Sequence, residues 1–148
     1  MPKGMFVDTT ICIGCKACQV ACKQWNVLPG EPADFRTDPA EKIPVAVNFT
    51  GDSYDNTADL TGTNWRRVRF IEQFPENRVG GRWLISSDSC KHCNDAGCLN
   101  ACPTGALVRT DLGNVALRQD VCIGCKYCLP SCPFGVVAFS HQTGTARK

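Results

Sequence analysis

The chain has 148 residues, twelve cysteines and a formal net charge of +2. Its basic residues are scattered rather than clustered, and metal-bound thiolates would make the charge negative, so composition argues against a nucleic-acid partner. The longest apolar run towards the carboxyl end is GVVAF at 135 to 139, far short of the roughly 18 residues of a membrane span. The first ten residues, MPKGMFVDTT, hold no apolar signal-peptide core. We therefore expect a soluble chain without a direct membrane span.

The first predicted element is a cysteine-rich loop, CIGCKACQVAC at 12 to 22. We expect little helix in the chain, limited to short turns that start near the last cysteine of each such block. Residues 26 to about 63 are rich in Pro, Gly, Asp, Asn and Thr, which predicts a long surface excursion. The segments 65 to 72, WRRVRFIE, and 82 to 86, RWLIS, then predict a β-hairpin across the loop from Pro75 to Gly81.

A second cysteine-rich stretch, CKHCNDAGCLNACP, occupies residues 90 to 103. Two short strands follow, predicted at about 106 to 109 and 115 to 118 and joined through a Gly113-Asn114 turn. The third stretch, CIGCKYCLPSC at 122 to 132, precedes Pro133. The final residues, HQTGTARK at 141 to 148, are interpreted as a tail.

All twelve cysteines fall into these three blocks of four. The first and third blocks agree at the four cysteines and also at Ile, Gly and Lys, which makes them an internal repeat. The second block is a variant with two extra residues in its middle spacing. The candidate metal and cofactor ligands are Cys12, Cys15, Cys18, Cys22, Cys90, Cys93, Cys98, Cys102, Cys122, Cys125, Cys128 and Cys132.

This spacing suits a cubane iron-sulfur cluster. Its irons occupy the corners of a small cube, so three thiolates with two-residue spacers can each reach a different corner. Gly14 and Gly124 supply backbone freedom where the loop must curl around the cluster, and Ile13 and Ile123 can cover it from water. Disulfides are a poor alternative without a secretory signal, and tetrahedral zinc would leave an odd thiol in each block.

The run C-x2-C-x2-C-x3-C-P is typical of bacterial two-cluster ferredoxins, in which the fourth cysteine ligates the other cluster. Applied here, this pattern implies two crossed ligand sets. One set is Cys122, Cys125, Cys128 and Cys102, and the other is Cys90, Cys93, Cys98 and Cys132. The predicted fold class is α+β, with ferredoxin-like 4Fe-4S modules, short β-hairpins, little helix and a long loop insertion.

The chain accordingly divides into five predicted parts. They are a first cluster-binding block (1–25), a loop-rich insertion (26–64), a β-hairpin (65–89), a two-cluster ferredoxin-like module (90–140) and a C-terminal tail (141–148). Four further residues beside the cysteines have two readings, as groups that tune a cluster or as ordinary solvated side chains: Lys16, Lys91, His92 and Lys126.

Electron transfer is the function that the motifs favour. In the crossed arrangement every iron of the second and third blocks has a thiolate, so no iron there is open to substrate. The CxxxCxxC motif of radical-generating enzymes is absent from the sequence, and no nucleophile, acid-base pair or phosphate loop accompanies the cysteines. Catalytic residues are therefore predicted to be none, and serial electron transfer is preferred over a structural role for the clusters.

The runs GMFVDTTICIGCKACQVACKQWN, CKHCNDAGCLNACPTGAL and CIGCKYCLPSCPFGV closely resemble the iron-sulfur (beta) subunit of formate dehydrogenases. That subunit belongs to the polyferredoxin-type electron-transfer subunits of the molybdopterin oxidoreductase group. The resemblance implies a non-catalytic subunit that relays electrons from a molybdenum or tungsten pterin catalytic subunit towards a membrane cytochrome b or a soluble acceptor. Alternatives are a subunit of a dimethyl sulfoxide, polysulfide or nitrate reductase, or a stand-alone polyferredoxin. The family works either in the cytoplasm or in the periplasm, after co-export with its catalytic partner.

Members of this group usually carry a fourth cysteine block that pairs with the first. We therefore expect two complete clusters in the 90–132 module and a third at the first block, which lacks the partner of Cys22. One interpretation is that the chain is a fragment of a four-cluster subunit. The other is that the first block closes on itself, with Cys22 as the fourth ligand of its own cluster.

Overall fold

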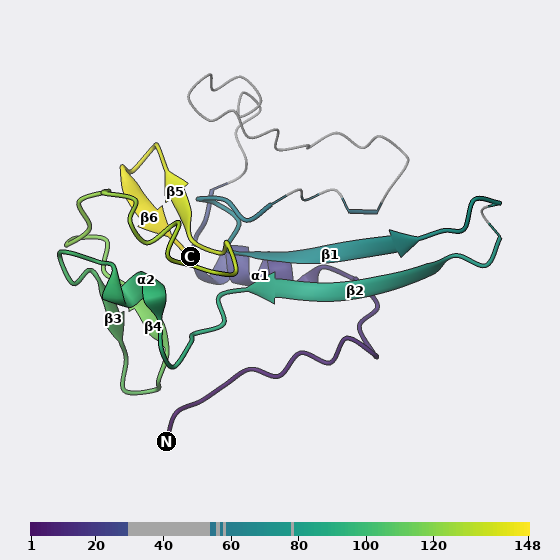
Figure 1. Cartoon of the computed structure of the whole chain (residues 1–148), viewed down its shortest axis with the longest axis horizontal. Helices are drawn as coiled ribbons and strands as arrows, with labels where there is room; N and C mark the ends of the chain where they lie inside the picture. The colour runs from purple at the N-terminus through teal and green to yellow at the C-terminus, as the bar shows by residue number, and fades with distance from the viewer. Residues whose placement is uncertain (30–53, 56, 58, 78) are drawn as a thin grey trace. The chain divides into compact units, whose positions relative to one another are not determined.

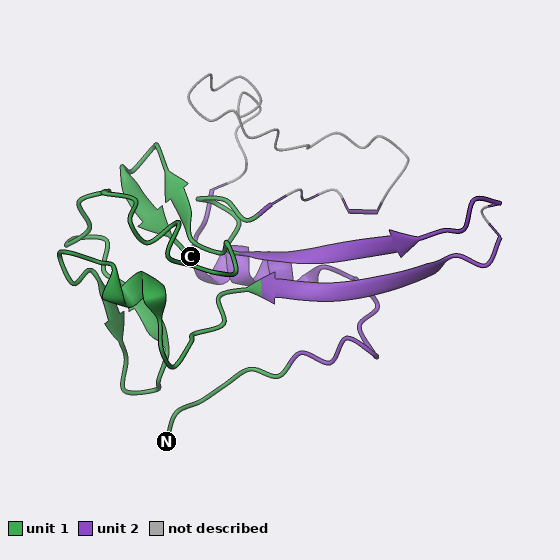
Figure 2. Cartoon of the chain, viewed as in Figure 1, with its two compact units in different colours: residues 1–6, 60–65, 89–148 green, residues 7–59, 66–88 purple. Residues whose placement is uncertain are grey.

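The computed structural model describes residues 1–29, 54–55, 57, 59–77 and 79–148. Within them lie two helices and three two-stranded sheets (Figure 1). The chain divides into two compact units, which Figure 2 distinguishes by colour. Unit 1 comprises residues 1–6, 60–65 and 89–148, and unit 2 comprises residues 7–59 and 66–88. No helix among the described residues is long and apolar enough to cross a membrane.

Unit 2 is built on one long hairpin and one helix. Strand β1, Arg66–Gln73, pairs with strand β2, Arg82–Ser89, and helix α1, Ala17–Trp25, packs against β1. The side chain of Val68 on β1 is only 1% exposed and is the best buried among the described residues of this unit. The predicted hairpin is confirmed, and its second strand continues three residues beyond the predicted end at residue 86.

Helix α1 corrects the expectation of short turns at the last cysteine. It has nine residues and begins at Ala17, five residues before Cys22. Its length follows from the residue after that cysteine, which is Lys23 rather than proline. Pro103 and Pro133 occupy the same position in the other blocks, where a proline stops a helix because it lacks an N–H and its ring clashes with the preceding turn.

Unit 1 contains a four-residue helix and two short hairpins. Helix α2, Gly97–Asn100, spans the third rather than the last cysteine of its block. Strand β3, Leu107–Arg109, pairs antiparallel with β4, Val115–Leu117, and Leu107 lies opposite Leu117. The hairpin predicted around Gly113 is thus confirmed. Strand β5, Ala138–Ser140, pairs antiparallel with β6, Thr145–Arg147.

The β5–β6 hairpin differs from the prediction, because the sequence favours a tail at residues 141–148. Each strand has three residues, too few for an alternating apolar pattern, and residues 141 to 144, HQTG, hold no Gly-Asn pair like the one that marked the equally short β3–β4 hairpin. The predicted surface excursion at 26–63 also needs revision at its end. Residues 30–53, 56 and 58 of that stretch lie outside the described part, but Leu60, Thr61 and Thr63 are buried in unit 1.

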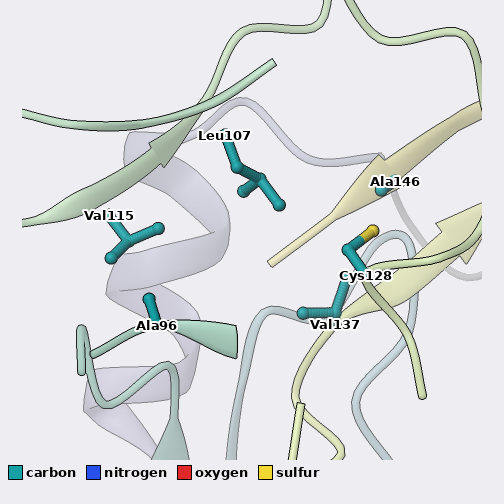
Figure 3. Close-up of a cluster of buried hydrophobic side chains, with 6 residues drawn as sticks. All are labelled: Ala96, Leu107, Val115, Cys128, Val137 and Ala146. Carbon is teal, nitrogen blue, oxygen red and sulfur yellow. The ribbon is translucent and has the colours of Figure 1, made fainter. Parts of the chain in front are cut away.

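The core of unit 1 is small and contains a cysteine. Figure 3 shows its buried members, which are Ala96, Leu107, Val115, Cys128, Val137 and Ala146. The partly buried residues packed against them are mostly cysteines, namely Cys93, Cys98, Cys102, Cys122 and Cys132, together with Leu99, Leu117 and Leu129. Thiols of the second and third blocks therefore occupy the centre of this unit, where a larger domain has apolar side chains. The predicted α+β fold class with short hairpins and little helix is confirmed.

Candidate metal centres

The three cysteine blocks are distributed over the two units. The first block lies in unit 2, at the start of α1, and the second and third blocks share unit 1. All twelve thiols are free of disulfides. Among the described residues, no three His, Cys, Asp or Glu side chains converge closely enough to hold a single metal ion. A cubane cluster does not require such convergence on one ion, because its four thiolates bind at four separate corners.

The loops of the three blocks share one left-handed position, and those of the first and third blocks share a second. The residue before the second cysteine is left-handed in each block, with φ of 71° at Gly14, 50° at His92 and 70° at Gly124. In the first and third blocks the residue after that cysteine is left-handed too, with φ of 59° at Lys16 and 65° at Lys126. The repeat seen in the sequence is therefore a repeat of backbone conformation, and the glycines occupy the positions where a side chain is strained.

Two of these glycines also permit close packing. A Cβ at Gly14 would lie 2.7 Å from Cε1 of Phe70, on β1, and a Cβ at Gly124 would collide with the carbonyl oxygen of Gly144. The first-block loop therefore sits directly on the β1–β2 hairpin. The third-block loop sits on the turn that joins β5 to β6.

The second and third blocks end in matching turns. The amide of Cys102 donates to the carbonyl of Leu99 at 3.2 Å, and the amide of Cys132 donates to that of Leu129 at 3.2 Å. The two segments also touch. A Cβ built on Gly97 would lie 2.7 Å from the carbonyl oxygen of Ser131, so the backbones beside Cys98 and Cys132 are in close contact.

Burial and neighbouring thiolates raise the pKa of two cysteines in unit 1. Burial, together with the charges of Cys122, Cys125 and Cys102, raises the pKa of Cys128 to about 11. Burial also raises the pKa of Cys98. There the Lys148 ammonium opposes the shift, while the charges of Cys132 and Cys90 add to it. The pKa of each of these thiols is thus raised by at least one cysteine of its own block and by one cysteine of the other block.

Cys102 has the opposite shift. Burial favours its neutral thiol, but hydrogen bonds from the backbone N–H groups of Leu107, Ala106 and Thr104 and from the Thr104 hydroxyl outweigh it, so its pKa is lowered. The hydroxyl of Thr104 lies 3.7 Å from the sulfur. Cys90 accepts from the backbone N–H of His92 at 3.4 Å. Donors aimed at sulfur stabilise a thiolate and are the groups that surround the ligands of an iron-sulfur cluster.

The first block is held by contacts within unit 2. The sulfur of Cys18 lies 3.5 Å from the hydroxyl of Ser87 on β2, and the side-chain amide of Asn26 donates to the sulfur of Cys22 at 3.8 Å. Isoleucine at position 13 is 82% exposed in this loop, and Ile123 is 68% exposed in the third-block loop. Their suggested role as covers over the clusters stays a prediction.

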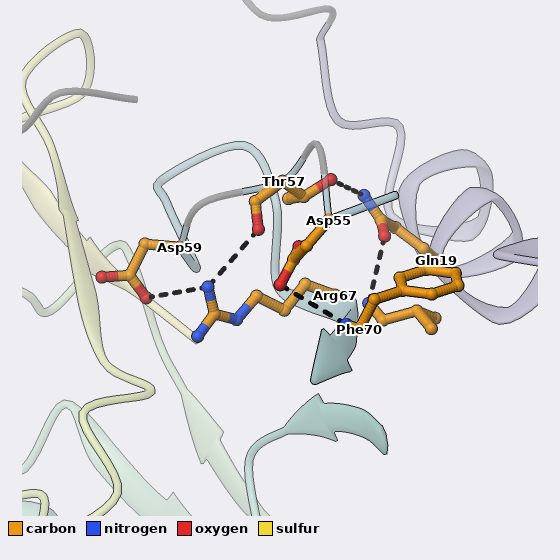
Figure 4. Close-up of polar contacts among 7 residues, drawn as sticks. Gln19, Asp55, Thr57, Asp59, Arg67 and Phe70 are labelled. Atoms are coloured by element: carbon orange, nitrogen blue, oxygen red, sulfur yellow. Dashed lines mark hydrogen bonds and ion pairs between the residues drawn. The ribbon is translucent and has the colours of Figure 1, made fainter. Parts of the chain in front are cut away.

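A glutamine fixes α1 to its hairpin. The side-chain carbonyl of Gln19 accepts from the backbone N–H of Val68 at 3.2 Å, and its amide donates to the Thr57 hydroxyl at 3.1 Å (Figure 4). Arg67, buried next to Val68, donates to the Thr57 carbonyl at 3.4 Å and lies 3.8 Å from the carboxylate of Asp59 (Figure 4). These contacts determine where α1, and with it the first block, lies on the hairpin.

The lysines singled out in the cysteine loops contact aromatic rings. Lys16 lies 5.3 Å from the ring centre of Phe70, and Lys126 lies 4.2 Å from that of Phe139. His92 is exposed, and its Nδ1 accepts from the backbone N–H of Val115 at 3.0 Å, so it links the second-block loop to β4. Lys91 is likewise exposed.

Two residues outside the blocks were missed by sequence reasoning. Arg109 on β3 donates to the backbone carbonyls of Cys93 and Asn94, and to that of Gly113 at 2.7 Å, which ties the second-block loop to the β3–β4 hairpin. The Nζ of Lys148 donates to the sulfur of Cys90 at 3.1 Å. Neither residue is near a cysteine in the sequence, so no local pattern pointed to them.

The residues present fit a cubane cluster. Unit 1 supplies eight free thiols on two loops that share a left-handed residue before the second cysteine, N–H and hydroxyl donors at the sulfurs of Cys90 and Cys102, and a core that one cysteine joins and five others pack against. Thiolate sulfur is the ligand type that such clusters require.

Comparison with known proteins agrees with this geometry. Residues 11–106 and residues 81–148 each match a family described as 4Fe-4S dicluster domain. The chain is 41% identical over 144 residues to the "Formate dehydrogenase, nitrate-inducible, iron-sulfur subunit" of Escherichia coli, covering 97% of this chain and 43% of that protein. It is 42% identical to the "Formate dehydrogenase iron-sulfur subunit" of Haemophilus influenzae, over 97% of this chain and 41% of that protein.

A more distant relative is the B subunit of the anaerobic dimethyl sulfoxide reductase of Escherichia coli, which is 30% identical over 98% of this chain and 58% of its own length. The chain thus spans less than half the length of the two formate dehydrogenase subunits it matches. The resemblance inferred from the cysteine blocks is confirmed. The chain belongs to the 4Fe-4S dicluster domain family, and its cofactors are 4Fe-4S clusters.

Proposed function

We propose that the chain is a non-catalytic electron-transfer subunit that relays electrons from a molybdenum or tungsten pterin subunit of a formate dehydrogenase. The acceptor is a quinone-linked membrane cytochrome b or a soluble carrier. When bound, a 4Fe-4S cluster supplies a one-electron redox centre. The similarity of the chain to formate dehydrogenase iron-sulfur subunits at 41–42% identity supports formate over dimethyl sulfoxide, for which the related reductase subunit is 30% identical.

One observation carries the proposal. The eight thiols of two blocks are gathered in one small unit, and six of them lie in its core or pack against it. Two clusters held so close together exchange electrons readily, and fully thiolate-ligated irons leave no position for a substrate. A relay is the function that such an arrangement serves.

We also propose that the clusters of unit 1 are ligated crosswise. One set is Cys122, Cys125 and Cys128 with Cys102, and the other is Cys90, Cys93 and Cys98 with Cys132. The close approach of Gly97 and Ser131 supports the second set, because it brings the backbones next to Cys98 and Cys132 into contact. The first set is supported by the charge of Cys102, which raises the pKa of Cys128. The second is supported by the charge of Cys132, which raises the pKa of Cys98.

Cysteine substitutions in combination test the crossed scheme. In a chain with Cys90→Ala and Cys93→Ala, one cluster of unit 1 is left. We expect Cys132→Ala to leave the EPR signal of that cluster unchanged, because Cys132 belongs to the set already removed, and Cys102→Ala to change it. The reverse result, with Cys132→Ala perturbing the remaining cluster, would show that the third block closes on itself.

We place a third cluster at the first block, with ligands Cys12, Cys15 and Cys18 and with Cys22 as the residue whose partner decides its form. Iron analysis of the anaerobically purified chain distinguishes the alternatives. About twelve irons per chain indicate that Cys22 closes a complete cluster, whereas about eleven indicate an open three-iron site and about eight an empty one.

A turnover assay tests the non-catalytic role. The purified chain with its clusters should not oxidise formate with a dye as acceptor, and adding a pterin catalytic subunit should start electron flow through the chain. Formate oxidation by the chain alone, at a rate that follows its concentration and survives removal of any pterin protein, would refute the proposal. Co-purification with a large pterin protein would support it directly.

A further inference from the structure

Lys148, which lies outside the cysteine blocks, contacts a candidate cluster ligand. The half-buried Lys148 lies immediately after β6, and its Nζ donates to the sulfur of Cys90 at 3.1 Å. Its positive charge also reaches Cys98, the third cysteine of the same block. Lys16 and Lys126, in the loops of the first and third blocks, instead lie over aromatic rings.

The fold holds Lys148 in this position. Successive residues of a strand point to opposite faces, so Lys148 continues the face of Ala146, which is 3% exposed and packs in the core with the cysteines. The turn before β6 is itself held in place, because the carbonyl of Gly144 lies against Gly124 in the third-block loop. The hairpin that is seated on the third block therefore delivers the Lys148 side chain to the second block.

The preceding residue points elsewhere. Arg147 donates to the Thr143 hydroxyl at 3.1 Å, within its own hairpin, and of the thiolates it is the charge of Cys122 that acts on its guanidinium. The two cations at the end of β6 are thus divided between the two blocks. Lys148 acts on the Cys90 side with a direct hydrogen bond, and Arg147 faces the Cys122 side.

We propose that Lys148 is a potential-setting residue that selectively raises the reduction potential of the cluster bound by Cys90, Cys93 and Cys98. The inference rests on the proposed function, in which these clusters carry electrons. Reduction adds one negative charge to a cluster that is already anionic. A hydrogen-bonded ammonium at a ligand sulfur stabilises that added charge, and partial burial keeps water and salt from screening it.

Lys148 therefore increases the affinity of the cluster on the Cys90 side for an electron, whereas it has little effect on the cluster on the Cys122 side.

The test is an EPR-monitored redox titration of the full chain, purified anaerobically with its clusters. Lys148→Gln removes the ammonium, and Lys3→Gln is the matched control, since it removes the same charge from an exposed position of unit 1. Cys93→Ser marks which EPR signal belongs to the second block. We expect Lys148→Gln to weaken reduction of that cluster about tenfold, which is about 59 mV for a one-electron couple.

Labelling gives a second readout that needs no variant. In wild-type protein with ¹⁵N at the lysine Nζ atoms, the reduced second-block cluster should show a ¹⁵N hyperfine coupling. The inference is overturned if this coupling is missing or if Lys148→Gln shifts neither reduction potential. It is also overturned if Lys148→Gln shifts both potentials by the same amount, as removal of a remote charge would. Failure of the proposed function looks different, because then the wild-type chain itself has no reversible couples.

Discussion

Substitution of Gly97 by alanine tests whether the second and third blocks are held in contact. The new Cβ would lie 2.7 Å from the carbonyl oxygen of Ser131, whereas ordinary contact begins at 3.4 Å, so one backbone must retreat by about 0.7 Å. Overpacking of this kind costs about 1–3 kcal/mol. Alanine gains up to about 1 kcal/mol over glycine in a helix, and Gly97 is the first residue of α2, where that gain is smaller. The net expectation is a loss of about 1–2 kcal/mol.

Release of iron to a chelator measures this loss, because unfolding frees the clusters. At a fixed guanidinium concentration under argon, 1–2 kcal/mol corresponds to release that is roughly 5–30 times faster. Gly4→Ala is the control, since a Cβ at Gly4 meets nothing within 4 Å. The EPR signal that decays first in the Gly97→Ala chain should be that of the second-block cluster. Release as slow as in the wild type would refute the tight contact on which the crossed ligation depends.

Three further predictions concern the supports of the clusters. Arg109→Gln loses charge-assisted hydrogen bonds to the second-block loop and should destabilise unit 1 by about 1–2 kcal/mol. The readout is faster iron release from the second-block cluster, and an unchanged rate would show that Arg109 does not hold this loop in place. Gln19→Ala leaves the Val68 amide and the Thr57 hydroxyl unsatisfied and should cost about 1–2 kcal/mol in unit 2, with hydrogen exchange at Val68 as the readout and no faster exchange as the contrary result. Oxidative removal of iron should collapse the amide NMR dispersion of residues 89–148, because the cysteines form much of that core, and dispersion retained without iron would contradict this.

The cysteine spacing predicted much of the site. The blocks, the repeat, both central hairpins and the curled loops around Gly14 and Gly124 followed from local patterns, since two-residue spacers and left-handed glycines act over a few positions. The length of α1 could also have been inferred from Lys23, which replaces the proline found in the other blocks. These are features that a short stretch of sequence determines by itself.

Contacts between distant segments could not be predicted. Lys148 reaches Cys90 across 58 positions, and Arg109 reaches Cys93 across 16, so neither is visible without the fold. The β5–β6 hairpin was missed because its short strands flank HQTG, a turn without the Gly-Asn pair that marked the β3–β4 hairpin. The buried segment at Leu60 to Asn64 was missed because polar residues such as Thr61, Thr63 and Asn64 bond to each other there and resemble a surface loop in composition.

The most direct test of the electron-relay account is to count the electrons that the chain stores and returns. The chain with its clusters is reduced with dithionite under argon, freed of reductant and mixed with an excess of a mild oxidant such as oxidised methylene blue. The account predicts that the two clusters of unit 1 together return about two electrons per chain, one from each cluster. Repeated cycles should cause no loss of iron. Return of less than one electron per chain, or loss of iron at each reduction, would contradict an electron-carrying function and leave the clusters as structural elements.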